Sequence, residues 1–525
     1  MLFDLSEHVN LPNYSHLATL ASSIVYYYIN CIILFIMKIG VHGGIIVAFN
    51  GKEHRLLENG IIVFEEGKII HVGKSYSGHL DKKIDARKRL VIPGLVNIHS
   101  HFASNPYSKS YRGDGSSRAV YNSDLFDRGR AFGASITRED YIHSVRFSLA
   151  RQLKSGVTTV VEMGAVDALG DEKAVELTGD SGIRAYLLKA IRSGTYYTEN
   201  GHNVLFTNFD GEKWDETQGF RQLEDALKFI KKYDGAQNNR IKSFLYPSAI
   251  YNCSPSIFKE ARKQANEHNL LITSHVSEAA LTFREMLRRH GKTPIELLSD
   301  FGILGQDFIA GHSIFVSGHS SSGYADPWDK DIRLLSESKS TVAHCPIVFS
   351  RYGIAMESYS KYKRMGVNMA IGTDSFPQDI LREMRLASTL SKVIEGEASV
   401  ASSLDLFNSA TICGANALHR PDLGRIAIGA KADLVFIKLD SFNMSPFRDP
   451  IRNFVQLAES SDVDRVIVDG ETLVEDGKVL GFDEAENFEA IQESMNKICE
   501  RIPENDRASR TIEDLMASTI NKWEE

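Results

Sequence analysis

Residues 95–101 read LVNIHSH, a continuous apolar run that ends in two histidines. A strand buried on both faces has this pattern, because neither side faces water. Seven similar runs follow, most leading into a helical stretch: TTVVEM (158–163), AYLLKAI (185–191), SFLYPSA (243–249), LLITSH (270–275), FIAGH (308–312), TVAHCP (341–346) and NMAIGTD (368–374). Eight such units over about 280 residues favour an α/β fold, a (β/α)8 TIM-type barrel, which typically takes about 250 residues. An open doubly wound sheet is the alternative, but no G-x-G-x-x-G follows the first run.

Short strand-like runs broken by glycine lie on both sides of this central region. IIVAF (45–49) and RLVIPG (89–94) precede it, and GRIAIGAKADLVFI (424–437) follows it. We therefore expect one small β-sandwich-like domain built from both ends of the chain. The predicted division is a leader or mis-assigned start (1–37), the first β part (38–91), the barrel (92–420), the second β part (421–484) and a helical extension (485–525).

The C-terminal extension is polar and amphipathic. Its apolar residues recur at three- and four-residue spacing, as on one face of a helix: Phe488, Ile491, Met495 and Ile498. We expect helices that pack on the barrel or on a neighbouring subunit, so a homo-oligomer is possible.

The overall composition is that of an ordinary globular protein, with a net charge of -8. A nucleic-acid or anionic-membrane surface would need a basic excess, so neither partner is expected. The five cysteines are scattered, and no pair has CxxC spacing. This usage favours a reducing compartment, and a cytoplasmic location is predicted.

Residues 17–36 read LATLASSIVYYYINCIILFI and carry no charged side chain. Their length is close to the roughly 20 apolar residues that cross a bilayer. No Lys or Arg precedes Lys38, so a secretory signal is not indicated. A membrane anchor stays open, but we expect a chain starting at Met37 to fold and to be active.

Polar residues with metal-binding or acid–base chemistry stand where the central runs end. His99 and His101 end the first, His275 the fifth, His312 the sixth and Asp374 the eighth. Barrel enzymes build their active sites at this edge from several strands. A lone histidine at a strand end is usually structural, so the prediction depends on all of these residues coming together.

Three imidazoles and one carboxylate form a donor set that suits zinc, and iron or manganese as alternatives. His99 and His101 can share one face of a strand, because side chains alternate with a period of two. A divalent ion held there lowers the pKa of a bound water from about 15.7 toward 7, which makes hydroxide at neutral pH. Metal-assisted hydrolysis is the chemistry that these residues indicate.

Five segments together resemble the amidohydrolase superfamily, in the order that this superfamily uses. They are PGLVNIHSH (93–101), SHVSEA (274–279), AGHS (310–313), AHCP (343–346) and AIGTDS (370–375). The branch that they resemble includes triazine hydrolases, guanine and cytosine deaminases and adenosylhomocysteine deaminases. The resemblance covers roughly residues 38–480 and implies a (β/α)8 barrel enzyme that hydrolyses carbon–nitrogen bonds other than peptide bonds.

The resemblance also implies residue roles. His99, His101, His275 and Asp374 match the metal ligands, and Asp374 would in addition take a proton from the attacking water. Glu278 matches the carboxylate that shuttles a proton between the metal-bound water and a ring nitrogen. His312 matches the histidine that orients or stabilises the attacking hydroxide. The expected reaction is deamination, or a related C–N or C–Cl hydrolysis, of a small nitrogen heterocycle.

One metal ion is favoured over two. Two-metal members of the superfamily use a carboxylated lysine at the end of strand four, whereas here that strand runs SFLYPSAIYNC (243–253) without lysine. The alternatives are a two-metal cyclic-amide hydrolase, which the missing lysine disfavours, and an inactive scaffold, which the complete ligand set disfavours. Zinc deaminases of nucleic acids need a P-C-x-x-C motif, which this chain lacks.

The loops that follow the strands depart from the superfamily pattern, so the substrate itself is not predicted. Aromatic and guanidinium groups in these loops could stack on a flat heterocycle. The candidates for substrate binding are Tyr111, Arg112, His202 and Arg351. Glu162, which ends the second run, is a pocket residue or a structural hydrogen-bond acceptor.

Overall fold

The computed structural model describes residues 37–103, 106–111, 129–194, 196–199, 203–206, 214–326, 328–506, 508–516, 518–520 and 523. The apolar segment 17–36, for which a membrane anchor stayed open, lies outside these residues. Within the described part of the chain, no helix combines the length and the hydropathy that crossing a membrane requires.

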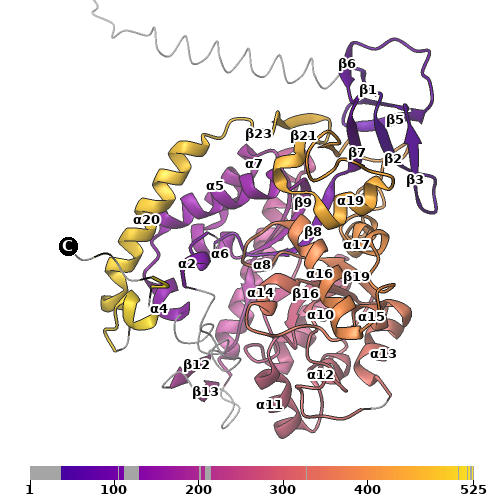
Figure 1. Cartoon of the computed structure of the whole chain (residues 1–525). Helices are drawn as coiled ribbons and strands as arrows, with labels where there is room; N and C mark the ends of the chain where they lie inside the picture. Colours follow the sequence, from indigo (N-terminus) through magenta and orange to yellow (C-terminus); the bar gives the residue numbers. More distant parts are fainter. Residues whose placement is uncertain are drawn as a thin grey trace, which may run out of the picture.

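Eight parallel strand segments form the central barrel, in the chain order that the sequence predicts (Figure 1). They are β8 (Leu95–Ser100), β9 (Val157–Met163), β10 with β11 (Arg184–Leu188, Ala190–Ile191), β14 with β15 (Ile241–Lys242, Tyr246–Pro247), β16 (Ile272–Val276), β17 (Phe308–His312), β18 (Thr341–His344) and β19 (Asn368–Ile371). A parallel bridge between Ser100 and Asp374 closes the circle from the eighth strand to the first. The (β/α)8 prediction is confirmed.

Helices follow the strands and cover the outside of the barrel. They are α5 (Arg138–Lys154), α6 (Ala165–Leu169), α7 (Asp171–Asp180), α8 (Glu216–Tyr233), α10 (Pro255–His268), α11 (Ala280–His290), α12 (Pro294–Asp300), α13 (Lys330–Glu337), α14 (Pro346–Ser350), α15 (Tyr359–Arg364), α16 (Ile380–Glu395), α17 (Ser403–Ser409) and α18 (Ile412–Ala417). Several begin at a side-chain cap: Thr137, for example, caps α5 in a capping box with Asp140. A hairpin of β12 (Tyr196–Glu199) and β13 (Asn203–Phe206) follows the third barrel strand.

Two sheets form the small β-sandwich beside the barrel. One has the order β5 (Lys68–Gly73), β4 (Ile61–Glu65), β1 (Ile39–His42) and β6 (Lys82–Asp85). The other has the order β23 (Lys478–Val479), β22 (Glu471–Glu475), β21 (Val463–Val468), β20 (Leu434–Lys438), β7 (Arg89–Pro93), β2 (Ile45–Phe49) and β3 (His54–Glu58). Because β20 pairs with β7, strands from both ends of the chain share one sheet, as predicted.

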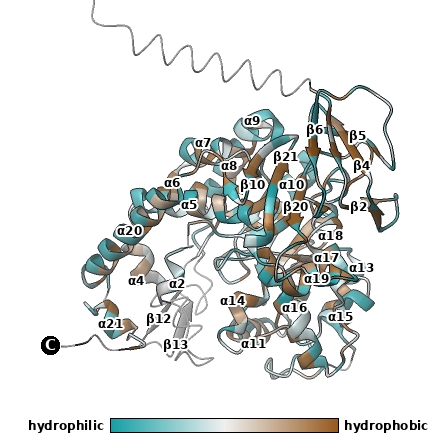
Figure 2. Cartoon of the chain, turned by 45° about the horizontal axis from the view of Figure 1, so that its top comes forward, coloured by the Kyte–Doolittle hydropathy of each residue, from teal (hydrophilic) through white to brown (hydrophobic). Residues whose placement is uncertain are grey.

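Apolar side chains of the two sheets meet in a common core. Val41 and Ile62 from one sheet, and Ile46, Val91 and Leu434 from the other, are fully buried in it. Figure 2 shows the matching hydrophobic colour along β2, β4 and β21. Burial of apolar surface between the sheets therefore stabilises this domain.

A buried ion pair links the barrel to the sandwich. Arg184, at the start of the third barrel strand, is 1% exposed and forms an ion pair with Asp433, which is 3% exposed. Asp469 lies 3.7 Å from the same guanidinium. Asp433 also accepts a hydrogen bond from the backbone N–H of Asp469 at 2.7 Å.

We expect Asp433→Ala to lower the free energy of unfolding by about 3 kcal/mol, because removing one partner leaves a buried charge without compensation. The nearby Asp469 keeps the loss at the lower end of the usual range. Urea unfolding followed by circular dichroism measures it, with Asp440→Ala, which removes a carboxylate that is 49% exposed, as the control. An unchanged midpoint for Asp433→Ala would contradict a structural role for this pair.

The C-terminal stretch forms the helices expected of it. α20 (Glu484–Asn505) packs against α4 (Gly129–Ala134) and α5, and the short helix α21 (Ile512–Leu515) follows. Ile498 is fully buried, and Ile491 and Met495 pack against the same cluster. Phe488 departs from the prediction, because 52% of it remains exposed.

Candidate active site

The end of β8 has an irregularity that turns its histidines toward the barrel axis. The pairing of β8 with β9 shifts register between Asn97 and Ser100. The Asn97 amide bonds to Gln152 of the outer helix α5 at 3.0 Å, whereas the ring of His99 lies against the rings of three other histidines. In a regular strand, residues 97 and 99 would share a face. A β-bulge re-aims side chains in this way and is common beside active sites.

Backbone carbonyls hold His101 and His275 so that the Nε2 atoms of the two rings face each other. His101 Nδ1 donates to the carbonyl of Met163 at 2.5 Å, and His275 Nδ1 donates to the carbonyl of Ser248 at 3.0 Å. Both Nε2 atoms then carry lone pairs when the rings are neutral, and they lie 3.3 Å apart. Metal-binding histidines typically donate their second N–H to a carbonyl. Two nitrogens on one tetrahedral zinc ion lie roughly 3.4 Å apart.

Two sets of side chains that could hold a metal ion meet in this region, and His99 belongs to both. One is His99, His275 and His312, and the other is His99, His101 and Asp374. Within each set the donor atoms lie within 4.8 Å of one another. All four predicted ligands are therefore brought together, with His312 beside them.

His99 and His312 are buried without hydrogen bonds from their ring nitrogens to the described residues. Burial, together with the neighbouring imidazoles, holds the pKa of His99 well below its usual range. Burial lowers the pKa of His312 to about 3. Neutral imidazole is the form that binds a metal ion, and a buried nitrogen without a partner is costly unless a ligand satisfies it. The donor set therefore fits a divalent cation.

Glu278, His312 and Asp374 face one another across the mouth of the barrel. His312 Nε2 lies 3.7 Å from Glu278 Oε2 and 3.5 Å from Asp374 Oδ2. Tyr251 donates to Glu278 Oε1 at 2.8 Å and orients this carboxylate. The chain thus places a candidate base, a candidate proton carrier and an imidazole within one small region.

Two of these residues have backbone conformations that side chains other than glycine rarely adopt. The φ angle is 75° at His312 and 52° at Asp374. Such conformations cost about 1–3 kcal/mol each and are typical of functional sites, where the surrounding structure maintains them. β17 ends at His312, and Asp374 follows the end of β19 by three residues, so the strained backbone turns each side chain away from the direction of its strand.

Two glycines make room for His99. A Cβ atom at Gly372 would lie 2.7 Å from His99 Cβ, and one at Gly311 would lie 3.1 Å from His99 Cε1. These glycines are the second residue of IGTD and the residue before His312. Their presence in the motifs follows from the close packing of His99 between strands six and eight.

Further side chains hold the loops around the site. Gln378 donates to the carbonyl of His101 at 2.9 Å. Asn97 bonds to Thr373 at 2.8 Å and so joins the first strand to the eighth behind the histidines. Phe349 covers His312, with 4.7 Å between ring centroids. The sequence alone does not indicate these roles, because they depend on contacts between distant segments.

The other predicted residues have different outcomes. The guanidinium of Arg351 stacks 4.2 Å from the ring of Phe376, two residues beyond Asp374, so it stays a candidate. The backbone of Tyr111 ends α2 (Ser108–Tyr111), while Arg112 and His202 lie outside the described residues. Glu162 is fully buried and accepts from the backbone N–H groups of Phe102 and Ala165, which is the structural alternative.

Comparison with known proteins agrees with this geometry. Residues 90–473 match the family described as the Amidohydrolase family. The chain is 30% identical over 452 residues to a 5-methylthioadenosine/S-adenosylhomocysteine deaminase of Pyrococcus abyssi, covering 85% of this chain and 96% of that protein. The chain belongs to the amidohydrolase family. It is a metal-dependent hydrolase of the branch that contains deaminases of adenosine derivatives.

Further similar proteins are also named as deaminases or as a chlorohydrolase. A 5'-deoxyadenosine deaminase of Methanosarcina barkeri is 29% identical, covering 85% of this chain and 95% of that protein. The fold matches an adenosine deaminase from Xanthomonas campestris with bound zinc, with a TM-score of 0.74, 20% identity and coverage of 88% and 98%. It also matches the zinc complex of an atrazine chlorohydrolase from Arthrobacter aurescens, with a TM-score of 0.73, 21% identity and coverage of 87% and 100%.

Proposed function

We propose that this chain removes the exocyclic amino group of an adenine nucleoside or a related 6-aminopurine by hydrolysis. The observation that carries the proposal is the meeting of His99, His101, His275 and Asp374 with Glu278 and His312 at the mouth of one barrel. The names of the relatives at about 30% identity, which are deaminases of adenosine derivatives, support the substrate class.

One zinc ion is the proposed cofactor, held by His99, His101, His275 and Asp374. The lysines on the third and fourth barrel strands support a single ion, because both are engaged elsewhere. Lys189 forms an ion pair with Asp171 at 2.8 Å, and Lys242 forms one with Asp234 at 3.1 Å. The nearby strand-four residue Ser248 instead offers its carbonyl to His275.

When bound, the ion supplies a water molecule activated for attack at neutral pH. Asp374 would accept one proton of the attacking water and pass it to the departing amine, which leaves as ammonia. His312, facing Asp374 across 3.5 Å, would orient the nucleophile and stabilise its charge. Glu278 would take the other proton of the water and deliver it to the ring nitrogen next to the reacting carbon. Tyr251 holds Glu278 in place for both transfers. General acid–base groups in this arrangement typically contribute about 10²–10⁴-fold to rate.

Metal analysis of the purified chain, followed by an ammonia-release assay, tests the proposal. We expect about one equivalent of zinc per chain, in line with a single four-ligand site. We expect release of ammonia from adenosine, 5'-deoxyadenosine or their 5'-thioether derivatives, and less from pyrimidines, pterins and aminotriazines. Two equivalents of metal with hydrolysis of a cyclic amide would replace this function with the two-metal alternative.

A further inference from the structure

The helix α20, from the far end of the chain, contacts the segment that follows the first barrel strand. Tyr107, six residues after His101, is 1% exposed and shares a buried cluster with Ile498 and Ile502, which are both 0% exposed. Ala131 and Phe132 of α4 belong to the same cluster. Two stretches of the connection between β8 and α5, residues 106–107 and 131–132, are therefore buried against one helix (Figure 1).

Polar contacts fix the same junction. The hydroxyl of Tyr107 donates to the backbone carbonyl of Asp140 at 2.8 Å. The carboxylate of Asp140 accepts from Arg501 of α20 at 2.7 Å and from the backbone N–H of Thr137 at 2.8 Å. Asp140 is only 4% exposed, so Arg501 supplies the charge that this buried carboxylate requires.

Helix α5 holds Phe102 and Ala103, which directly follow His101. The hydroxyls of Ser144 and Ser148 donate to the carbonyl of Phe102 at 2.9 and 3.1 Å. The chain leaving His101 is thus fixed first by α5 and then, at Tyr107, by α20. Tyr111, a candidate for substrate binding, ends the helix α2 that begins directly after Tyr107.

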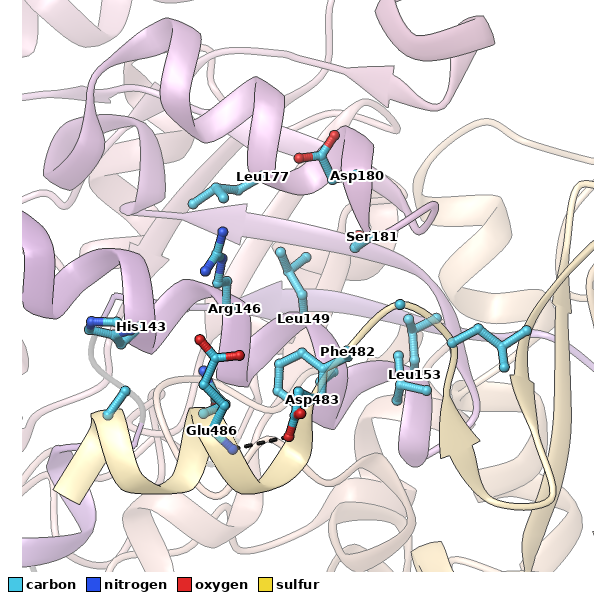
Figure 3. A pocket seen from close by; sticks show the side chains of 16 residues that line it. His143, Arg146, Leu149, Leu153, Leu177, Asp180, Ser181, Phe482, Asp483 and Glu486 are labelled. Carbon is cyan, nitrogen blue, oxygen red and sulfur yellow. Dashed lines mark hydrogen bonds between the residues drawn. The ribbon is translucent and has the colours of Figure 1, made fainter. Parts of the chain in front are cut away.

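The buried apolar side chains of α20, Ile498 and Ile502, lie in its second half. Near its start, the helix borders a cavity of about 290 Å³ that residues of α5 and α7 also line. Figure 3 shows Leu149, Leu177 and Phe482 around this cavity, with Glu486 on its edge. The buried apolar side chains of α20 thus meet Tyr107 and Phe132, whereas its first half borders the cavity.

We propose that α20 is a positioning element for the substrate, with Ile498, Arg501 and Ile502 as its positioning residues. This inference rests on the proposed function. Holding both described parts of the connection lowers the number of conformations open to the segment that carries Tyr111. A segment that is already ordered binds a ligand at a lower entropic cost. Substrate affinity then depends on α20, whereas metal binding by the ligands does not.

Two variants in the full chain, Ile502→Ala and Arg501→Gln, test the proposal, with Glu486→Gln on the same helix as the matched control. If a variant populates the substrate-binding conformation of this segment only about 10–20% of the time, KM rises about five- to tenfold. We expect kcat to change less than about twofold and the metal content to stay unchanged. Glu486→Gln should match the wild type in every measurement.

Limited trypsin digestion gives a second measurement that needs no substrate. Cleavage after Lys109 in α2 and after Arg130 in α4 requires these helices to open locally, so both variants should be cut faster there. Unchanged cleavage and unchanged KM would overturn the proposal, as would a joint loss of kcat, metal and folded structure in Arg501→Gln. If the wild type releases no ammonia from any heterocycle, the proposed function fails, and the cleavage rates still decide whether α20 anchors the connection.

Discussion

Glu278→Gln should lower kcat by about 10²–10⁴-fold while the bound metal stays in place, because glutamine keeps the shape of the side chain but cannot carry a proton. The amide can still accept the hydrogen bond from Tyr251, which is 2.8 Å long in the native protein. Glu278 is 6% exposed and is not a member of either set of potential metal ligands. Steady-state ammonia release and metal analysis on the same preparation measure the two effects.

Two further variants make this result specific. Glu285→Gln changes a carboxylate of α11 that pairs with Arg288 at 2.9 Å, and it should keep the wild-type rate. Tyr251→Phe removes only the group that orients Glu278, and we expect a loss of about tenfold, less than that of Glu278→Gln. A fully active Glu278→Gln would show that another group carries the proton.

The sequence predicts the barrel well, because the signal for each strand is local. A continuous apolar run such as FIAGH can be recognised without its neighbours, and all eight runs become barrel strands. The positions of His275, His312 and Asp374 follow from the same argument, since parallel strands end at one edge of the barrel. Fold and candidate ligands could therefore be predicted together.

The contacts that aim these side chains could not be predicted in the same way. The register shift in β8 becomes visible only against β9, and without it His99 would share the face of Asn97. Tyr251 meets Glu278 because strands four and five lie side by side at their ends, where Ala249 bridges to His275. Each of these features depends on pairing between segments, which a single sequence does not record.

The role of Tyr107 has the same origin. Its sequence context indicates a loop residue, and the structure buries it between the start of α5 and the C-terminal helix. The amphipathic pattern of residues 488–498 predicted a helix with a buried face but could not name what that face covers. A partner nearly four hundred residues away in the chain is set by the barrel topology.

His99→Ala should remove the metal and with it the activity, because His99 belongs to both sets of potential ligands. Loss of a residue that hydrogen-bonds to a metal ligand typically lowers metal affinity about 10–100-fold, so loss of the ligand itself should lower it further. We expect less than about one tenth of an equivalent of zinc after dialysis, against the single four-ligand site of the wild type. Turnover should fall to the background rate.

His344→Ala is the matched control, since it also removes a buried imidazole from the end of a barrel strand. His344 is 6% exposed, lies beside the ring of Tyr359 and belongs to neither potential ligand set among the described residues. Both variants lose a buried side chain, so both should unfold at lower temperature than the wild type. The difference between them is the metal: His344→Ala should retain its zinc, and a His99→Ala protein that also retained a full equivalent would disprove the assignment of His99.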